Sequence, residues 1–475
     1  MNVLAIDQGT SSTKALVVGP DGAVLAEAET PVHPRAVEAG GVEQDPEELW
    51  ESVLSAGQRA LAQAGVTVGA LGMANQGETV LAWQPANGRP LSAAISWQDR
   101  RALPICERLR EHGAGLQALT GLPLDPYFAA PKMRWLREQV TGEGVCTTTD
   151  AWLLHRLCGA YVTDAATASR TLLLDLDAVT WSRQACALFD VDADANPAIV
   201  PCAGGIGETT AFGRALPVAG LAVDQQAALF GERCLGAGEA KCTYGTGAFL
   251  LATVGPRPQR SAAGLVACVA WQLGDTTTYC LDGQIYTVGA ALGWLRDVGL
   301  IGHARDLDAL GAGTIDSGGA VFIPSLAGLG APFWRPSARG VFAGLSLATS
   351  RTQLVGAMVE GIAAQVAWLA RAAAADLGRS LLRLRVDGGL TRSRVLMQMQ
   401  ADLLQAPVEV YPSPHATALG VAALARLGSG AAADAASAVG RWRPAAVFEP
   451  RIDADEAEAR LHRWRRVAEA TMDLP

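Results

Sequence analysis

Residues 3–18 have the sequence Val-Leu-Ala-Ile-Asp-Gln-Gly-Thr-Ser-Ser-Thr-Lys-Ala-Leu-Val-Val, and this stretch decides the fold class. Two apolar runs flank a polar turn at Gly9-Thr10, which predicts a β-hairpin. Residues 241–254 repeat the pattern around Tyr244-Gly245-Thr246-Gly247, and the two threonines lie 236 positions apart in 475 residues. The recurrence predicts two halves of one design, with a ligand cleft between them.

The rest of the chain predicts an α/β protein, because short apolar runs ending at Gly alternate with Ala- and Leu-rich stretches of helical period. We expect a boundary near 231–239, giving domains 1–232 and 233–475, each long enough for its own core. In the second half, Ser350 and Gln353 form a capping-box pattern ahead of a helix. A strand at 382–386 ends at Asp387-Gly388-Gly389, a candidate nucleotide loop.

Composition indicates small-molecule chemistry. A net charge of -9 and a pI near 5.3 argue against nucleic-acid or anionic-membrane binding. The start lacks a basic leader, and no apolar run of about 18 residues is free of polar breaks, so we expect a soluble cytoplasmic protein. The nine Cys show no C-x-x-C pair, and the six His include no close pair suited to zinc. We therefore expect buried, reduced thiols.

The two hairpin turns are candidate phosphate sites, because backbone N–H groups and small hydroxyl side chains converge in such turns. The candidates are Thr10, Ser11, Ser12 and Thr246. Each turn alone would more often be an ordinary hairpin turn. The repeat favours phosphate binding, as do Asp7 and the lysines beside the turns: the chain has only Lys14, Lys132 and Lys241. No Walker loop or protein-kinase motif occurs.

Several motifs occur along the chain in a fixed order. They are Asp7-Gln8-Gly9-Thr10-Ser11, Asn75-Gln76-Gly77-Glu78-Thr79, Trp97-Gln98-Asp99-Arg100-Arg101, Asp125-Pro126-Tyr127-Phe128, Asp224-Gln225-Gln226, Tyr244-Gly245-Thr246-Gly247 and Gly328-Leu329-Gly330-Ala331-Pro332-Phe333-Trp334. From residue 1 to about 428 this order resembles the FGGY carbohydrate kinases, and most closely their glycerol kinase branch. The resemblance implies two actin-like, ribonuclease-H-like domains that close over ATP, Mg²⁺ and an alcohol.

The same resemblance implies roles for individual residues. Asp224 matches the general base, and Asp7 matches the residue that organises Mg²⁺. The acceptor residues are Gly77, Glu78, Trp97, Tyr127, Asp224, Gln225 and Phe249. The nucleotide residues are Thr10, Ser11, Ser12, Lys14, Thr246, Gly289, Gly388 and Gly389. Without the resemblance, Asp224 would more often be a helix N-cap, Asp7 a turn cap and each aromatic residue plain core.

One acceptor position departs from the family pattern: glycerol kinases have Arg where this chain has Gly77. Losing charge-assisted hydrogen bonds of about 1.5 to 3 kcal/mol would weaken glycerol binding about tenfold to a hundredfold. The vacated volume would instead suit a longer acceptor. We expect a small polyol or sugar of three to five carbons. The alternatives are a xylulose- or ribulose-type ketose kinase and a non-catalytic nucleotide-dependent binding protein; a homodimer or homotetramer is expected.

Overall fold

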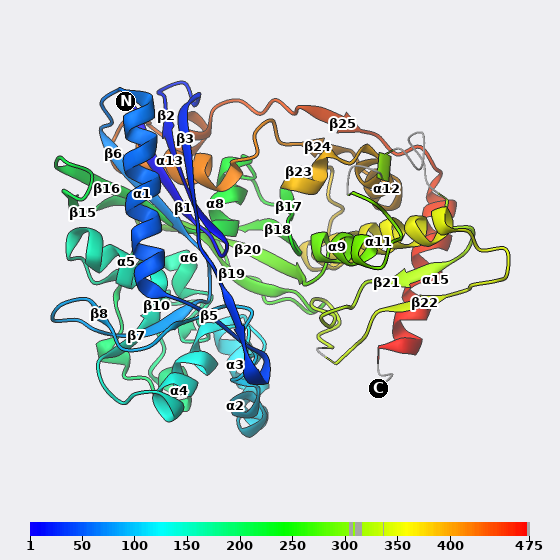
Figure 1. The fold of residues 1–475 in the computed structure, drawn as a ribbon, viewed down its shortest axis with the longest axis horizontal. Helices are drawn as coiled ribbons and strands as arrows, with labels where there is room; N and C mark the ends of the chain where they lie inside the picture. The colour runs from blue at the N-terminus through cyan, green and yellow to red at the C-terminus, as the bar shows by residue number, and fades with distance from the viewer. Residues whose placement is uncertain (304–306, 309–315, 336, 473–475) are drawn as a thin grey trace.

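The computed structural model describes residues 1–303, 307–308, 316–335 and 337–472, which form two lobes joined by one thirteen-stranded sheet (Figure 1). Within this sheet, five strands of the first half and five strands of the second half follow the same spatial order. The first-half strands are β3 (Val24–Pro31), β2 (Ser12–Val18), β1 (Val3–Gln8), β6 (Ala70–Asn75) and β16 (Leu216–Val223). Their second-half counterparts are β20 (Thr276–Ile285), β18 (Ala248–Gly255), β17 (Ala240–Tyr244), β23 (Leu384–Asp387) and β24 (Val408–Val410).

Both predicted hairpins are present. β1 pairs antiparallel with β2, placing Asp7 opposite Lys14, and parallel with β6. In the same way β17 pairs antiparallel with β18 and parallel with β23. The α/β class and the repeated design are confirmed, and both halves have the ribonuclease-H-like order that the resemblance implies. The carboxyl ends of β1 and β17 therefore present equivalent turns on either side of the cleft.

The principal helices cover the sheet. α1 (Pro46–Ala64) packs on β1, β2 and β3, and Asp45 caps it by accepting from the Glu47 N–H. α11 (Arg351–Leu377) begins with the predicted Ser350–Gln353 capping box and packs on β18 and β20. By length and mean hydropathy α11 alone among the described helices could cross a membrane, but 83% of its most apolar window is buried in the protein. It is a core helix of the second lobe.

One helix of the second half of the chain packs in the first lobe. α13 (Ala416–Gly428) belongs to the second half of the chain but packs on α8 (Asp224–Gly231) and on β6 and β16 of the first (Figure 1). The crossing is close because both helices carry Gly at the contact: a Cβ on Gly420 would collide with the Ala227 carbonyl. α8 also packs on β17 and β18 of the second half, so Asp224 at its start lies where the two halves of the chain meet.

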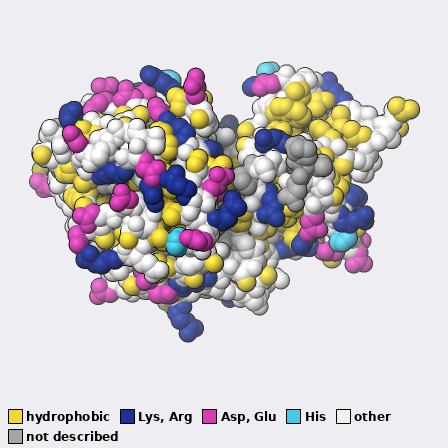
Figure 2. All heavy atoms as spheres, turned by 90° about the horizontal axis from the view of Figure 1, so that it is seen from below, with side chains coloured by type: hydrophobic (Ala, Val, Ile, Leu, Met, Phe, Trp, Pro, Cys, Tyr) yellow, Lys and Arg dark blue, Asp and Glu magenta, His cyan; other side chains and the backbone are white. Residues whose placement is uncertain are grey.

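A second sheet, built from β10, β7, β9, β5 and β4 with β8 at its edge, lies at the base of the first lobe and carries the loops of the acceptor side. β9 (Ala94–Ile95) leads to Trp97, and α4 (Ala129–Gln139) follows Tyr127. Seen from below, the surface is hollowed between the lobes, and acidic and basic side chains are interspersed over this face (Figure 2). The remaining strands are β10 (Val145–Thr148), β7 (Val80–Gln84), β5 (Gly41–Gln44), β4 (Arg35–Val37) and β8 (Arg89–Pro90).

Candidate active site

A cavity of about 70 Å³ lies where the two halves meet. Every residue predicted for the acceptor lines it, together with Thr10 from the first phosphate hairpin. The sequence order of these residues spans most of the chain, so only the fold brings them together. The predicted residues are Gly77, Glu78, Trp97, Tyr127, Asp224, Gln225 and Phe249; the cavity is also lined by Arg170, Val223, Gln226 and Asp282.

Three aromatic rings form the apolar wall of the cavity. Trp97 meets Tyr127 and Phe249 edge to face, with centroids 5.9 and 6.2 Å apart. Phe249 comes from β18 of the second half, whereas the other two come from the first. The Trp97 Nε1–H donates to Thr10 Oγ1 at 2.9 Å, which ties the acceptor wall to the first hairpin. Rings of this kind suit the carbon edge of a polyol, because their faces exclude water.

The loop that carries Tyr127 is fastened by a buried lysine. Lys132 is fully buried, and its Nζ donates to the carbonyls of Pro126, Tyr127 and Phe128. Burial lowers the pKa of this ammonium to about 7. Lys132 therefore holds the backbone of the predicted acceptor residue Tyr127. The negative charge of Glu78 opposes the effect of burial on the pKa of Lys132.

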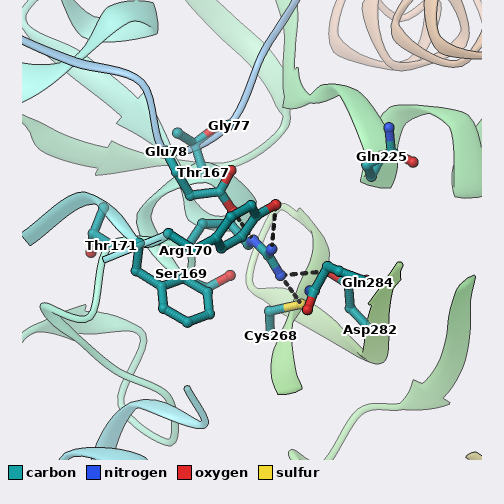
Figure 3. Close-up of polar contacts among 12 residues, drawn as sticks. Gly77, Glu78, Thr167, Ser169, Arg170, Thr171, Gln225, Cys268, Asp282 and Gln284 are labelled. Carbon is teal, nitrogen blue, oxygen red and sulfur yellow. Dashed lines mark hydrogen bonds and ion pairs between the residues drawn. The ribbon is translucent and has the colours of Figure 1, made fainter. Parts of the chain in front are cut away.

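Glu78 occupies a strained turn directly after β6. Its φ of 55° is uncommon for a residue with a side chain, and such strain concentrates at functional sites. Glu78 is 3% exposed, and burial raises the pKa of its carboxyl despite the nearby Arg170. The Arg170 Nε–H donates to Glu78 Oε1 at 2.5 Å and so fixes the carboxylate (Figure 3).

Asp224 is the first residue of α8, one position beyond the N-cap, and its Oδ1 accepts from the Gln225 N–H at 2.7 Å. It therefore does not cap α8 in the ordinary way, because the N-cap position belongs to Val223. Burial raises the pKa of Asp224 to about 7, and the negative charges of Asp7 and Glu78 add to the rise. A carboxylate with that pKa, lining a cavity, is poised to accept a proton near neutral pH.

Gln225 is held by the lysine beside the second hairpin. Lys241 is fully buried, and its Nζ donates to Gln225 Oε1 at 2.6 Å and to Thr243 Oγ1 at 2.7 Å. The amide nitrogen of Gln225 is consequently oriented for donation to a ligand. The positive charge of Lys241 also lowers the pKa of Asp224, opposing the larger effect of burial.

The predicted nucleotide residues surround the two turns. Gly289 and Gly388 press against the second hairpin: a Cβ on Gly289 would lie 2.6 Å from the Gly245 carbonyl, and one on Gly388 would collide with that of Tyr244. Val288 N–H also donates to Thr246 O at 2.9 Å. Gly389 is exposed and has open space at its Cβ position.

The first turn closes through a bond from the Gly9 N–H to Ser12 O at 3.0 Å. Ser11 is exposed at its tip, whereas the Ser12 hydroxyl donates to Glu29 Oε1 at 2.6 Å. Ser12 is thus already engaged on β3, and its predicted phosphate contact remains a prediction. Lys14 lies on β2 opposite Asp7, where its charge opposes the larger effect of burial, which raises the pKa of that carboxyl.

Models of the FGGY family of carbohydrate kinases match both halves of the chain: its N-terminal domain matches residues 2–231 and its C-terminal domain residues 240–428. The chain belongs to this family. It is 44% identical to a glycerol kinase from Thermus brockianus over 98% of each chain. The structure is similar to that of Plasmodium falciparum glycerol kinase with ADP, at a TM-score of 0.90 and 30% identity over 99% and 98% of the two chains.

A xylulose kinase from Rhodospirillum rubrum has the same fold, with a TM-score of 0.87 and 25% identity over 99% of each chain. As an FGGY kinase, the chain is a phosphotransferase with an alcohol group as acceptor. The resemblance inferred from the motifs is confirmed, and so is the two-domain actin-like fold. The roles of individual residues and the domain boundary at 232 remain predictions.

The residues of this FGGY kinase fit a magnesium ion at the phosphate end. Burial, and to a smaller extent the charge of Asp387, raise the pKa of Asp7 to about 6 against the opposing charge of Lys14. Asp387 Oδ1 is buried without a hydrogen-bond partner among the described residues. Hard carboxylate oxygens of this kind are the ligands that Mg²⁺ prefers, often through water. Among the described residues no His, Cys, Asp and Glu side chains form a complete ligand set on their own, as expected where phosphate and water supply the remaining ligands.

Two charged cavity residues escaped prediction, Arg170 and Asp282. Each stands alone as a charge within a run of small or apolar residues: Arg170 follows Ala-Ala-Thr-Ala-Ser, and Asp282 follows Tyr-Cys-Leu. An isolated charge in such a run must find a partner or a ligand, because a buried unpaired charge is costly. That signal identifies both residues as candidates, but only the structure shows that they meet.

Proposed function

We propose that this FGGY kinase transfers the γ-phosphoryl group of ATP to a terminal hydroxyl of glycerol or a closely related small polyol. The carrying observation is the position of Asp224, a half-buried carboxylate with a pKa of about 7 in a cavity that is also lined by the first hairpin's Thr10. The high identity to a glycerol kinase supports the choice of acceptor.

The cavity size also supports a small acceptor. A volume of about 70 Å³ has room for about five water molecules, close to what a three-carbon polyol displaces. The volume expected at Gly77 is partly taken, because a Cβ there would lie 3.0 Å from Val223 Cγ2. The longer acceptor suggested by Gly77 is therefore the second candidate, as is a ketopentose.

In the proposed reaction, Trp97, Tyr127 and Phe249 enclose the carbon chain and exclude water. Asp224 accepts the proton of the attacking hydroxyl, and Gln225 and Glu78 orient the hydroxyls. Thr10 and Thr246 present their turns to the phosphates from opposite lobes. Mg²⁺, when bound, neutralises phosphate charge, and Asp7 with Asp387 would hold it through carboxylate oxygens.

The test is ADP release measured with glycerol, erythritol, pentitols and ketopentoses as acceptors. We expect glycerol to give the highest kcat/KM and Asp224→Asn to abolish most of the release. A clear preference for a ketopentose would instead favour the second candidate. No release with any acceptor would favour a non-catalytic nucleotide-binding protein. We further propose a cytoplasmic homo-oligomer, which sedimentation at working concentrations would test.

A further inference from the structure

The acceptor cavity contains a positive charge that no family motif in the sequence indicates. Arg170 follows α6 (Ala165–Ala168), is 3% exposed, and lines the cavity together with Glu78 and Asp282 (Figure 3). Its Nε–H donates to Glu78 Oε1 at 2.5 Å, and an Nη1–H donates to Asp282 Oδ2 at 2.6 Å. The two carboxylates lie on opposite halves of the chain, so the guanidinium bridges them.

This bridge has unused hydrogen-bonding capacity. The Nη2 group makes only a long contact of 3.4 Å to the Tyr127 hydroxyl, which is weaker than an ordinary hydrogen bond. Among the described residues, Asp282 Oδ1 is buried without any hydrogen-bond partner. The cavity lining thus contains a weakly used donor, Arg170 Nη2, and an unpaired acceptor, Asp282 Oδ1. A hydroxyl group can accept from the first and donate to the second.

We propose that Arg170 and Asp282 together bind the hydroxyl of the acceptor that lies farthest from the phosphorylated one. This inference rests on the proposed kinase function and names a specificity-determining pair within it. Arg170, in the turn after α6, supplies the guanidinium that the family pattern places at position 77. Asp282, on strand β20, supplies a carboxylate oxygen beside it. The expected loss of affinity at Gly77 is thereby offset.

The surroundings of Gly77 agree with the replacement of the family's arginine at this position by Arg170. A side chain at position 77 would press on Val223, whose Cγ2 lies 3.0 Å from the Cβ position. Val223 is buried and itself lines the cavity. An apolar surface therefore stands on the Gly77 side, while the charged donor enters from the side of Arg170.

The charges of the cavity define the chemical class of acceptor. Glu78, Asp224 and Asp282 bring three carboxyl groups to its wall, against the single guanidinium of Arg170. A sugar acid would place a further anion beside these groups, and like charges at short range are unfavourable. The pair therefore selects neutral polyols with a free terminal hydroxyl over aldonic acids.

The experiment compares glycerol with propane-1,2-diol, which lacks one terminal hydroxyl, in wild type, Asp282→Asn and Arg170→Lys. We expect both variants to raise the KM for glycerol by about tenfold to a hundredfold, with a smaller change in kcat. The KM for propane-1,2-diol should change by less than about threefold, because this diol has no hydroxyl for the pair. Wild-type preference for glycerol therefore shrinks in the variants.

The matched control is Arg385→Lys, which alters another buried arginine. Arg385 is 6% exposed and donates to the Glu232 and Arg233 carbonyls and to Glu239, away from the cavity. Arg385→Lys should keep the wild-type ratio of the KM values for the two acceptors, even if this variant is less stable. Calorimetric titration of glycerol into nucleotide-free protein gives a second readout, with a weaker Kd expected in Asp282→Asn.

An equal loss for both acceptors, or an unchanged preference, would overturn the inference and assign Arg170 a purely structural part. If Arg170→Lys does not fold, Asp282→Asn decides, because it keeps the size and shape of the side chain. If the wild type phosphorylates glycerol and Asp282→Asn keeps the wild-type selectivity, this inference fails but the proposed function stands. Wild-type protein that phosphorylates no polyol defeats the proposed function as well.

Discussion

Asp224→Asn should inactivate the enzyme and stabilise it, and both effects come from one desolvated carboxyl group. Removing a general base costs about a hundredfold to ten-thousandfold in kcat. Burial raises the pKa of Asp224 from 3.8 to about 7 in the folded protein. The folded state thus binds this proton more tightly than the unfolded state, so the stabilising contribution is present below pH 4 and is lost as pH rises through 7.

The magnitude follows from the size of the shift. Because of this rise of roughly three pKa units, the unfolding free energy of the wild type is lower by about 4 kcal/mol above pH 7 than it is below pH 4. Asparagine cannot ionise, so the variant avoids that cost. In a cooperative unit of roughly 200 residues, 1 kcal/mol shifts Tm by about 2 °C. We expect Asp224→Asn to raise Tm by about 5 to 10 °C at pH 8, and by much less near pH 4.5.

The assay is thermal unfolding of wild type and variant at half-unit pH steps from 4.5 to 8.5, without nucleotide. Glu51→Gln, an exposed substitution on α1, is the matched control and should give a small difference at every pH. A Tm difference for Asp224→Asn that does not grow with pH would refute the argument that Asp224 is desolvated. Wild-type kcat in the variant would refute its catalytic role.

Three further results are expected. Lys132→Met should raise the KM for glycerol about tenfold, because the Tyr127 backbone loses its anchor; unchanged steady-state kinetics would contradict that positioning role. Thr246→Val should raise the KM for ATP by roughly tenfold while leaving the KM for glycerol unchanged. A change in the KM for glycerol alone would contradict the assignment of the second hairpin to the nucleotide. In wild type, kcat/KM for glycerol should rise about tenfold per pH unit below 7 and level off above it, as Asp224 loses its proton; a flat profile between pH 5.5 and 7 would exclude Asp224 as the base.

The two hairpins could be predicted from the sequence because their information is local. A β-hairpin with Gly and Thr at its turn is specified by a few neighbouring residues, and the repeat at 246 favoured a shared role for the two turns. Both hairpins occur as predicted, with Asp7 opposite Lys14. Asp224 was predicted from the family resemblance, and it does line the cavity, although α8 begins one residue earlier than the Asp-Gln-Gln run indicates.

The acceptor end could be predicted only in part because its information is distributed. Arg170 meets Glu78 across 92 positions and Asp282 across 112 positions, and no short motif contains two of the three. Their meeting depends on the alignment of β20 and of the turn after α6 with the end of β6. The sequence contained isolated charges that required partners, but the choice of partner is a property of the packed fold.

The same distribution limits what Gly77 alone can predict about the acceptor. A position that lacks a side chain predicts a larger pocket only when nothing else fills the space, and here Val223 approaches to 3.0 Å of the missing Cβ. A lost donor likewise predicts weaker binding only when no other donor reaches the ligand. Arg170 belongs to the first half of the chain and Asp282 to the second, so the cavity depends on both lobes. Selectivity for the acceptor should therefore depend on how the lobes close, as well as on the residues of the family motifs.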